Sequence, residues 1–178
     1  MKQAGLGGVR VAVLTVSDRV AAGTRDDAGG SALCELLEGA GAELVSRAVV
    51  PDDREPIMEA LRAMTGDAEV VLTTGGTGLG PRDVTPEATR AVLDREAPGI
   101  AEALRAASLA ITPFAMLSRA TAGLTGRTLV VNLPGNPKAV REEWSVLAAV
   151  LAHAVETARG PVPDDSHRHG DGAHPGGR

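Results

Sequence analysis

The sequence has 178 residues, a length that predicts a single domain with one buried core. Its formal net charge of −5 at pH 7 excludes a broad basic surface for a nucleic-acid backbone or an anionic membrane. Aromatic residues make up only 1% of the chain, which argues against the stacking platforms of single-stranded nucleic-acid binding and predicts an aliphatic core.

The first half of the chain predicts three strands, at 9–16, 43–50 and 69–74, and the nearly continuous apolar run of the first indicates that it is buried. A loop rich in Gly and Asp at 17–30 precedes apolar residues at helical spacing, which are Leu33, Leu36, Leu37 and Ala40. Gly41 is the expected end of that helix. Asp53 is expected to cap the next helix, whose apolar face is Ile57, Leu61 and Met64.

The second half continues the alternation of strands and helices. Thr85 followed by Pro86 predicts a helix start with the Thr85 hydroxyl as its N-cap, and another helix is expected after Pro98. Segments 115–122 and 128–133 are predicted to be strands. The last helix should begin near Pro137, and its buried face should consist of Val140, Trp144, Leu147, Leu151 and Val155.

This alternation predicts an α/β sandwich with a mostly parallel central sheet. Residues 1–159 are expected to form the domain. From Gly160 the chain is rich in Gly, Pro, Asp and His, which bury too little surface to offset ordering, so 160–178 are predicted to be a disordered tail. The tail's His167, His169 and His174 are interpreted as solvated, with weak metal chelation as the alternative.

Cys34 is the single cysteine and lies in an apolar helical stretch, so we interpret it as a small core residue and not as a nucleophile. The chain has no apolar run of the ~20 residues that a bilayer span needs. Its first ten residues lack the apolar segment of a secretory signal. A cytoplasmic protein that binds neither membrane nor nucleic acid is therefore expected.

Four unusual loops follow predicted strands: 17–19, 50–53, 75–85 and 132–138. Ligands of open α/β sheets bind at the carboxyl ends of the strands, so these loops are candidates for one shared site. The glycines at 75, 76, 78 and 80 would let backbone N–H groups approach an anion closely. The alternative is a tight structural turn, since the segment matches neither a P-loop nor a dinucleotide fingerprint.

Three aspartates accompany these loops. Asp83 lies beside the glycine loop, and a carboxylate next to bound phosphate favours Mg²⁺. It could equally be a solvated loop acid or a favourable charge at a helix N-terminus. Asp52 and Asp53 carry the same ambiguity, because one of them is expected to cap the following helix.

Lys138 follows Pro137 at the expected start of the last helix. The helix dipole disfavours a cation at this end, so a bound phosphate would explain a lysine there, although a lone lysine is normally surface decoration. No histidine lies in the four loops, and no Ser-His-Asp or Cys-His set is evident.

Five segments, taken in order, carry a resemblance: LTVSDR at 14–19, TTGGTG at 73–78, PRDVTP at 81–86, LSR at 117–119 and NLPGNPK at 132–138. Together they resemble the Mog/MoaB family of molybdenum-cofactor biosynthesis proteins, from about Val9 to Ala158. The resemblance implies a three-layer α/β fold around a mostly parallel sheet, and commonly a homotrimer. The segment Asp26 to Gly30 departs from the family's usual Asp-x-Ser/Lys-Gly, which leaves a substrate-loop contact there in doubt.

The resemblance also implies roles for particular residues. Asp52 and Asp83 match the two essential aspartates and would hold Mg²⁺ on ATP, while Gly75, Gly76, Thr77 and Gly78 would hold the nucleotide. Contacts with substrate or phosphate are assigned to Ser17, Asp18, Arg82, Ser118, Arg119, Asn132, Pro134, Gly135, Asn136 and Lys138.

The implied activity is adenylylation of molybdopterin by Mg-ATP, with molybdopterin and ATP as substrates and other molybdenum-cofactor enzymes as further partners. One alternative is a MoaB-type molybdopterin-binding protein with little or no activity. Another is a different nucleotide reaction on the same fold, as in the related domain of the competence-damage proteins.

Overall fold

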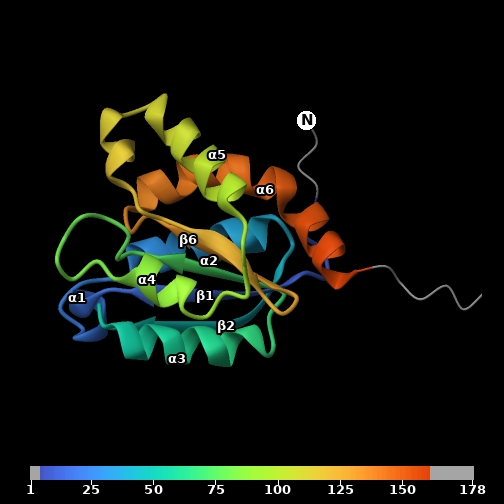
Figure 1. The fold of residues 1–178 in the computed structure, drawn as a ribbon, viewed down its shortest axis with the longest axis horizontal. Coiled ribbons are helices and arrows are strands. Elements are labelled where there is room, and N and C mark those ends of the chain that lie inside the picture. Colours follow the sequence, from blue (N-terminus) through green and yellow to red (C-terminus); the bar gives the residue numbers. More distant parts are fainter. Residues whose placement is uncertain (1–4, 161–178) are drawn as a thin grey trace, which may run out of the picture.

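The computed structural model describes residues 5–160, which form a six-stranded sheet with helices on both faces (Figure 1). The sheet order is β2-β1-β3-β6-β5-β4. The neighbouring pairs β2/β1, β1/β3 and β3/β6 are parallel, whereas β6/β5 and β5/β4 are antiparallel. The predicted α/β class with a mostly parallel sheet is therefore confirmed.

The strands are β1 Arg10–Val16, β2 Glu43–Val50, β3 Val70–Thr74, β4 Arg95–Glu96, β5 Ala122–Thr125 and β6 Thr128–Leu133. The helices are α1 Asp18–Ala21, α2 Ala28–Gly39, α3 Arg54–Thr65, α4 Thr85–Arg90, α5 Pro98–Leu109 and α6 Pro137–Arg159, with a 3₁₀ helix η1 at Pro113–Leu117. The predicted second strand matches β2 at both ends.

Two apolar clusters make the molecule a three-layer sandwich. On one face of the sheet, α2, α5 and α6 pack against alternate side chains of β1, β3 and β6, such as Val11, Leu72 and Val131. On the other face, α3 and α4 pack against the intervening side chains, such as Leu14 and Val71. This alternation follows from the two-residue period of a strand.

Most of the sequence-based expectations for the helices hold. All five residues predicted for the buried face of the last helix are at most 5% exposed in α6. Gly41 has a φ of 75° just beyond α2, a conformation that glycine adopts readily. Cys34 packs partly buried against the core, and this burial raises the pKa of its thiol.

Two local expectations were wrong, and one short strand was not predicted. Residues 115–122 do not form a strand, because Ala115–Leu117 belong to η1 and β5 begins at Ala122. The two-residue β4 was not foreseen. The N-cap of α4 is Val84, and the Thr85 hydroxyl instead donates to the carbonyl oxygen of Gly75 at 2.9 Å.

The described residues contain no helix that is long and apolar enough to span a membrane. The tail after Gly160, with its three histidines, lies outside the described residues, so the predicted boundary of the domain stays a prediction.

Candidate active site

A cavity of about 600 Å³ opens at the carboxyl ends of β1 and β3 and beside the loop after β6. This volume lies within the range of ligand pockets in proteins. All four loops singled out from the sequence contribute to its lining, through Ser17, Asp52, Gly75, Asp83 and Gly135 among others. The prediction that these loops meet at one edge of the sheet is confirmed.

The turn after β3 brings the backbone close to the end of β1. Gly75 has a φ of 100°, and a Cβ there would lie 2.2 Å from the carbonyl oxygen of Val16. The Gly75 N–H donates to the carbonyl of Leu133 at 3.2 Å, so this residue also joins β3 to β6. Glycine is required here because any side chain would separate the strands that form the floor of the cavity.

Asp52 and Asp18 both line the cavity and exchange hydrogen bonds. The Asp18 N–H donates to Oδ2 of Asp52 at 2.7 Å, and the Asp52 N–H donates to Oδ1 of Asp18 at 3.0 Å. Arg82 donates to both carboxylate oxygens of Asp18, from Nε at 3.0 Å and from Nη2 at 2.8 Å. Asp53 occupies the N-cap position of α3 without a side-chain capping bond.

The two carboxylates therefore differ in electrostatic environment. The hydrogen bond from Arg82 lowers the pKa of Asp18. Burial raises the pKa of Asp52, and the neighbouring charges of Asp18 and Asp83 act in the same direction. A carboxylate surrounded by like charge gains free energy from a cation, so Asp52 is the more receptive of the two.

The Asp83 carboxylate sits over the glycine loop. Its Oδ2 accepts the N–H of Gly80 at 2.8 Å. A Cβ on Gly78 or on Gly80 would lie 2.9 or 2.8 Å from the same oxygen. The closely spaced glycines thus give Asp83 room to fold back over its own loop.

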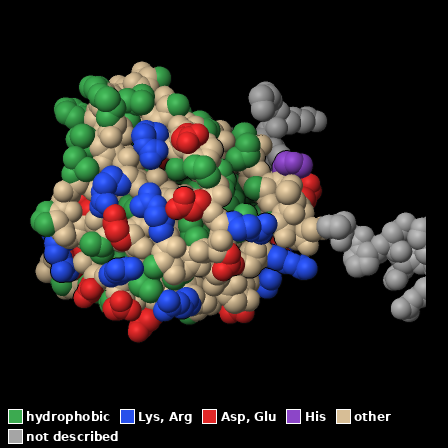
Figure 2. Space-filling model, viewed as in Figure 1, with side chains coloured by type: hydrophobic (Ala, Val, Ile, Leu, Met, Phe, Trp, Pro, Cys, Tyr) green, Lys and Arg blue, Asp and Glu red, His purple; other side chains and the backbone are tan. Residues whose placement is uncertain are grey.

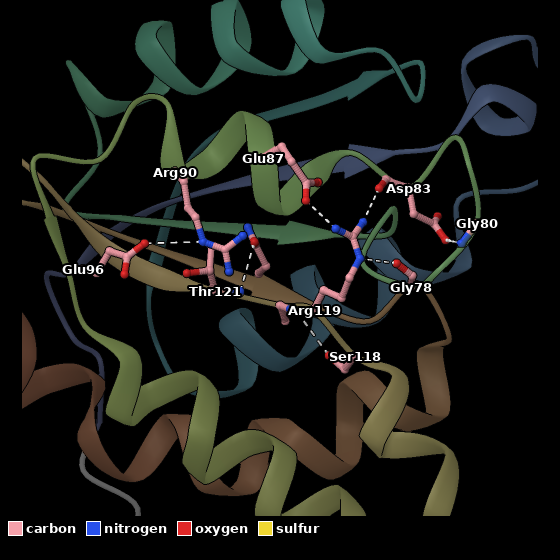
Figure 3. Close-up of polar contacts among 11 residues, drawn as sticks. Gly78, Gly80, Asp83, Glu87, Arg90, Glu96, Ser118, Arg119 and Thr121 are labelled. Atoms are coloured by element: carbon pink, nitrogen blue, oxygen red, sulfur yellow. Dashed lines mark hydrogen bonds and ion pairs between the residues drawn. The ribbon is translucent and has the colours of Figure 1, made fainter.

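Arg119 holds this loop from outside the cavity (Figure 3). Its Nε donates to the carbonyl of Gly78 at 2.7 Å, and its two other guanidinium nitrogens contact the carbonyl of Asp83 and the carboxylate of Glu87. Arg119 does not line the cavity.

The cavity lining also includes Asp27, which the sequence analysis did not select. Its carboxylate accepts hydrogen bonds from the Thr15 hydroxyl at 2.9 Å, the Gly30 N–H at 2.9 Å and Arg47 at 2.7 Å. Burial alone would raise the pKa of Asp27, but these bonds and the charge of Arg47 outweigh it and lower the pKa. The sequence signal was the Asp26 to Gly30 departure from the family pattern.

The loop after β6 divides into a structural and an exposed part. Asn132 is fully buried, and its Nδ2 donates to the hydroxyls of Thr73 and Thr89 at 2.9 Å each. The Pro134 carbonyl accepts the hydroxyl of Thr74 at 2.8 Å. Asn136 caps α6, and the side chain of Lys138 is 79% exposed with Nζ 3.8 Å from Glu142.

The predicted site residues therefore fall into two groups. The structure brings together on the cavity Ser17, Asp18, Asp52, Gly75, Gly76, Asp83, Gly135 and Asn136. It places outside the lining Thr77, Gly78, Arg82, Ser118, Arg119, Asn132, Pro134 and Lys138. Within the second group, Arg82, Arg119 and Pro134 contact residues that do line it, namely Asp18, Asp83 and Thr74.

Comparison with known proteins bears on this arrangement. The model of a family described as "Probable molybdopterin binding domain" matches residues 12–153. A molybdopterin adenylyltransferase of Helicobacter pylori is 36% identical over 160 residues, covering 85% of this chain and 89% of that protein.

Two further similarities extend the comparison. The molybdenum cofactor synthesis protein cinnamon of Drosophila melanogaster is 42% identical over 147 residues, covering 80% of this chain but only 24% of that protein. This chain thus spans about a quarter of that relative's length. The solved structure of the molybdopterin biosynthesis enzyme MoaB from Thermus thermophilus matches with a TM-score of 0.81 and 46% identity, covering 86% of this chain and 98% of that one.

Proposed function

This chain belongs to the family of probable molybdopterin binding domains, and from this premise we propose that it is a molybdopterin adenylyltransferase of molybdenum-cofactor biosynthesis. The reaction transfers AMP from ATP to the phosphate of molybdopterin and releases pyrophosphate. The observation that carries the proposal is the convergence of the Asp52 and Asp83 carboxylates with the Gly75–Gly76 turn on one cavity. A relative of similar length bears the name of this activity.

The chemistry of the reaction suits this lining. The attacking atom is an oxygen of the molybdopterin phosphate, which is already ionised at neutral pH and needs no general base. Its bond to the α-phosphorus of ATP forms while the bond from that phosphorus to the pyrophosphate oxygen breaks. The protein has to align two anions and stabilise the leaving charge. Among the described residues that line the cavity, none is His or Cys.

Asp52 and Asp83 would hold Mg²⁺ jointly with the phosphates of ATP. One or two carboxylates plus phosphate oxygens are the ligands that Mg²⁺ takes at such sites. Within residues 5–160, no hydrogen bond engages Oδ1 of either carboxylate, so each offers an oxygen. The same residues contain no group of three or more His, Cys, Asp and Glu that could hold a metal ion. When bound, the ion would neutralise charge on the phosphates and on the departing pyrophosphate.

The backbone of the Gly75–Gly78 turn would contact the nucleotide, with Gly75 and Gly76 nearest to the cavity. Ser17, Asp18, Gly135 and Asn136 line the same cavity, which supports the proposal that they contact substrate. For Arg82, Ser118, Asn132, Pro134 and Lys138, the contact with substrate or phosphate stays a prediction, since the structure shows their partners within the protein.

The alternative, a MoaB-type protein that binds molybdopterin with little activity, has no better support. Both aspartates are present and line the cavity. The relative that covers 85% of this chain is named for the adenylyl transfer.

Self-association as a homotrimer is the assembly that we propose. Large apolar side chains on α5, η1 and the turn between them are 41–76% exposed, namely Leu109, Ile111, Phe114, Met116 and Leu117. Figure 2 shows hydrophobic side chains gathered over this corner of the molecule. Contiguous exposed apolar surface typically marks an interface.

Sedimentation equilibrium at micromolar concentration should give the mass of a trimer, and a monomer would contradict the proposal. Contact with other molybdenum-cofactor enzymes stays a prediction.

One assay tests the proposed activity directly. Purified protein is incubated with molybdopterin and Mg-ATP, and the products are analysed by mass spectrometry. Adenylyl-molybdopterin and an equal amount of pyrophosphate are expected. If molybdopterin binds but no adenylylated product forms, the protein is the binding member of the family and the proposal is wrong.

A further inference from the structure

We propose that Arg119 is a positioning residue, which clamps the loop 78–83 and thereby orients the Asp83 carboxylate, in place of binding substrate itself. The inference rests on the proposed function for the role of Asp83. Arg119 lies between η1 and β5, far in sequence from the loop that it holds. Its backbone N–H donates to the carbonyl of Thr77 at 2.9 Å, which fixes the side chain at the start of the loop.

The guanidinium joins the two ends of the loop. Nε donates to the carbonyl of Gly78 at 2.7 Å, and a second nitrogen donates to the carbonyl of Asp83. These two carbonyls belong to the first and last residues of the loop. Figure 3 shows the guanidinium between them, with Gly80 and the Asp83 carboxylate on the far side.

Inside the loop, the Asp83 carboxylate completes the structure. The Gly80 N–H donates to Asp83 Oδ2 at 2.8 Å, and the Asp83 N–H donates to the carbonyl of Gly80 at 2.9 Å. The orientation of the carboxylate therefore depends on the separation of the two ends, which Arg119 sets. Mutation of a residue that orients a metal ligand typically lowers metal affinity or activity by about 10–100-fold.

The contacts of the Arg119 guanidinium are all with groups of the protein. Its third guanidinium contact is the carboxylate of Glu87 on α4, and Arg119 lies outside the cavity lining. A lysine could keep the ion pair with Glu87. Its single ammonium on a flexible stem would not span two carbonyls as the planar guanidinium does.

The same helix offers a matched control. Arg90 of α4 forms an ion pair with Glu96 at 3.4 Å, and both side chains are about half exposed. Figure 3 shows this pair away from the loop. Arg90→Lys therefore makes the same chemical exchange in another Arg–Glu pair, without touching residues 78–83.

The experiment compares wild type, Arg119→Lys and Arg90→Lys by titration calorimetry with ATP, once with Mg²⁺ and once with EDTA. Arg119→Lys should bind Mg-ATP about 10–100-fold more weakly, with little change for ATP in EDTA. Arg90→Lys should match wild type in both. Equal weakening with and without Mg²⁺ would overturn the clamp in favour of a direct contact between Arg119 and phosphate. Unchanged Mg-ATP binding would overturn it as well.

Two further measurements keep the inference independent of activity and of folding. Amide hydrogen exchange of peptides covering 78–83 should accelerate in Arg119→Lys and not in Arg90→Lys. This result is expected even if the wild-type protein makes no adenylyl-molybdopterin. Absence of that product would contradict the proposed function but not the role of Arg119. If Arg119→Lys does not fold, Arg119→Ala with millimolar guanidinium should recover Mg-ATP binding, and no recovery would overturn the clamp. Glu87→Gln keeps both carbonyl contacts and should leave loop exchange unchanged.

Discussion

Two hollows of this molecule differ in chemistry more than in size. The active-site cavity has about 600 Å³ and is lined by carboxylates, hydroxyls and glycine backbone. A groove of about 320 Å³ between α5 and α6 is lined by Gly99, Ile100, Ala103, Leu104, Val146, Leu147, Val150, His153 and Ala154. The cavity holds its polar groups in fixed pairs, such as Asp18 with Arg82 and Asp27 with Arg47.

The difference shows what a site for anionic substrates requires. Volume and apolar area can hold a ligand, but oriented donors and acceptors decide which ligand binds and in what pose. Substitutions in the cavity should therefore change turnover more than stability, and substitutions in the groove should do the opposite.

The largest effect should come from the groove. Leu147 is fully buried in α6, and Leu147→Ala should lower the free energy of unfolding by about 2–5 kcal/mol through lost contacts and the cavity left behind. Turnover per folded molecule should not change. Urea unfolding and active-site titration measure the two quantities. Val150→Ala, at a position that is 46% exposed, is the control and should stay within about 0.5 kcal/mol. A fall in turnover of folded Leu147→Ala would contradict the expectation that substitutions in the groove change stability and not turnover.

Next come the cavity aspartates. Asp52→Asn and Asp83→Asn should each lower turnover by about 10²–10³-fold, the scale of one lost electrostatic contact in the transition state. Stability should hardly fall, because burial already disfavours the charged form of Asp52. Asp53→Asn is the matched control, since Asp53 is exposed and makes no capping bond. Normal turnover in both Asp52→Asn and Asp83→Asn would refute the proposed mechanism.

A pair of glycines tests the comparison at the backbone. A methyl group at Gly80 would meet Asp83 Oδ2 at 2.8 Å, so Gly80→Ala should displace the carboxylate and lower turnover by up to about 10²-fold. At Gly99, in the groove, no atom lies within 4 Å of the added Cβ. Gly99→Ala should leave turnover unchanged and raise stability by no more than about 1 kcal/mol. Equal turnover in the two variants would contradict the expected difference between cavity and groove.

The smallest expected effect is a dependence of stability on pH through Glu143 of α6, which faces α5. Glu143 is 6% exposed, its Oε1 accepts the Ser108 hydroxyl at 2.9 Å, and Arg105 and Glu142 are the charges nearby. Burial raises its pKa above the ordinary 4.5. As pH rises past 4.5 the unfolded chain releases this proton first, so Glu143 increasingly lowers the stability of the folded state. Glu143→Gln should thus gain stability relative to wild type between pH 4 and 7, and equal stability throughout would contradict this.

The sequence predicted the parallel half of the sheet and missed its other edge. Strands β1, β3 and β6 are mostly apolar and buried, and β2 is eight residues long. In contrast, β4 has only two residues, both exposed, which is too short for a hydrophobic period to show. The segment 115–120 consists largely of helix-forming residues without β-branching, and Pro113 begins η1 there. That composition was a sufficient signal against a strand.

For the site, the sequence predicted which loops converge but not which partners their charged side chains contact. Loops that follow parallel strands meet at one edge, so their convergence could be predicted. Whether a charged side chain faces the cavity depends on partners far along the chain. Arg82 pairs with Asp18, and Arg119 binds Gly78 and Asp83, at separations that no local pattern encodes.

The order of strands in the sheet also governs when the cavity can come into existence. β3 has β1 on one side and β6 on the other, and Val70 pairs with Leu129, about 60 residues later. During synthesis, β3 therefore waits with one open edge until β6 has emerged, and Gly75 has no Leu133 carbonyl to bind until then. Such an edge can pair with other chains. A nascent or truncated chain that ends before residue 133 would be both inactive and prone to aggregate, because the last strand to arrive closes the floor of the cavity.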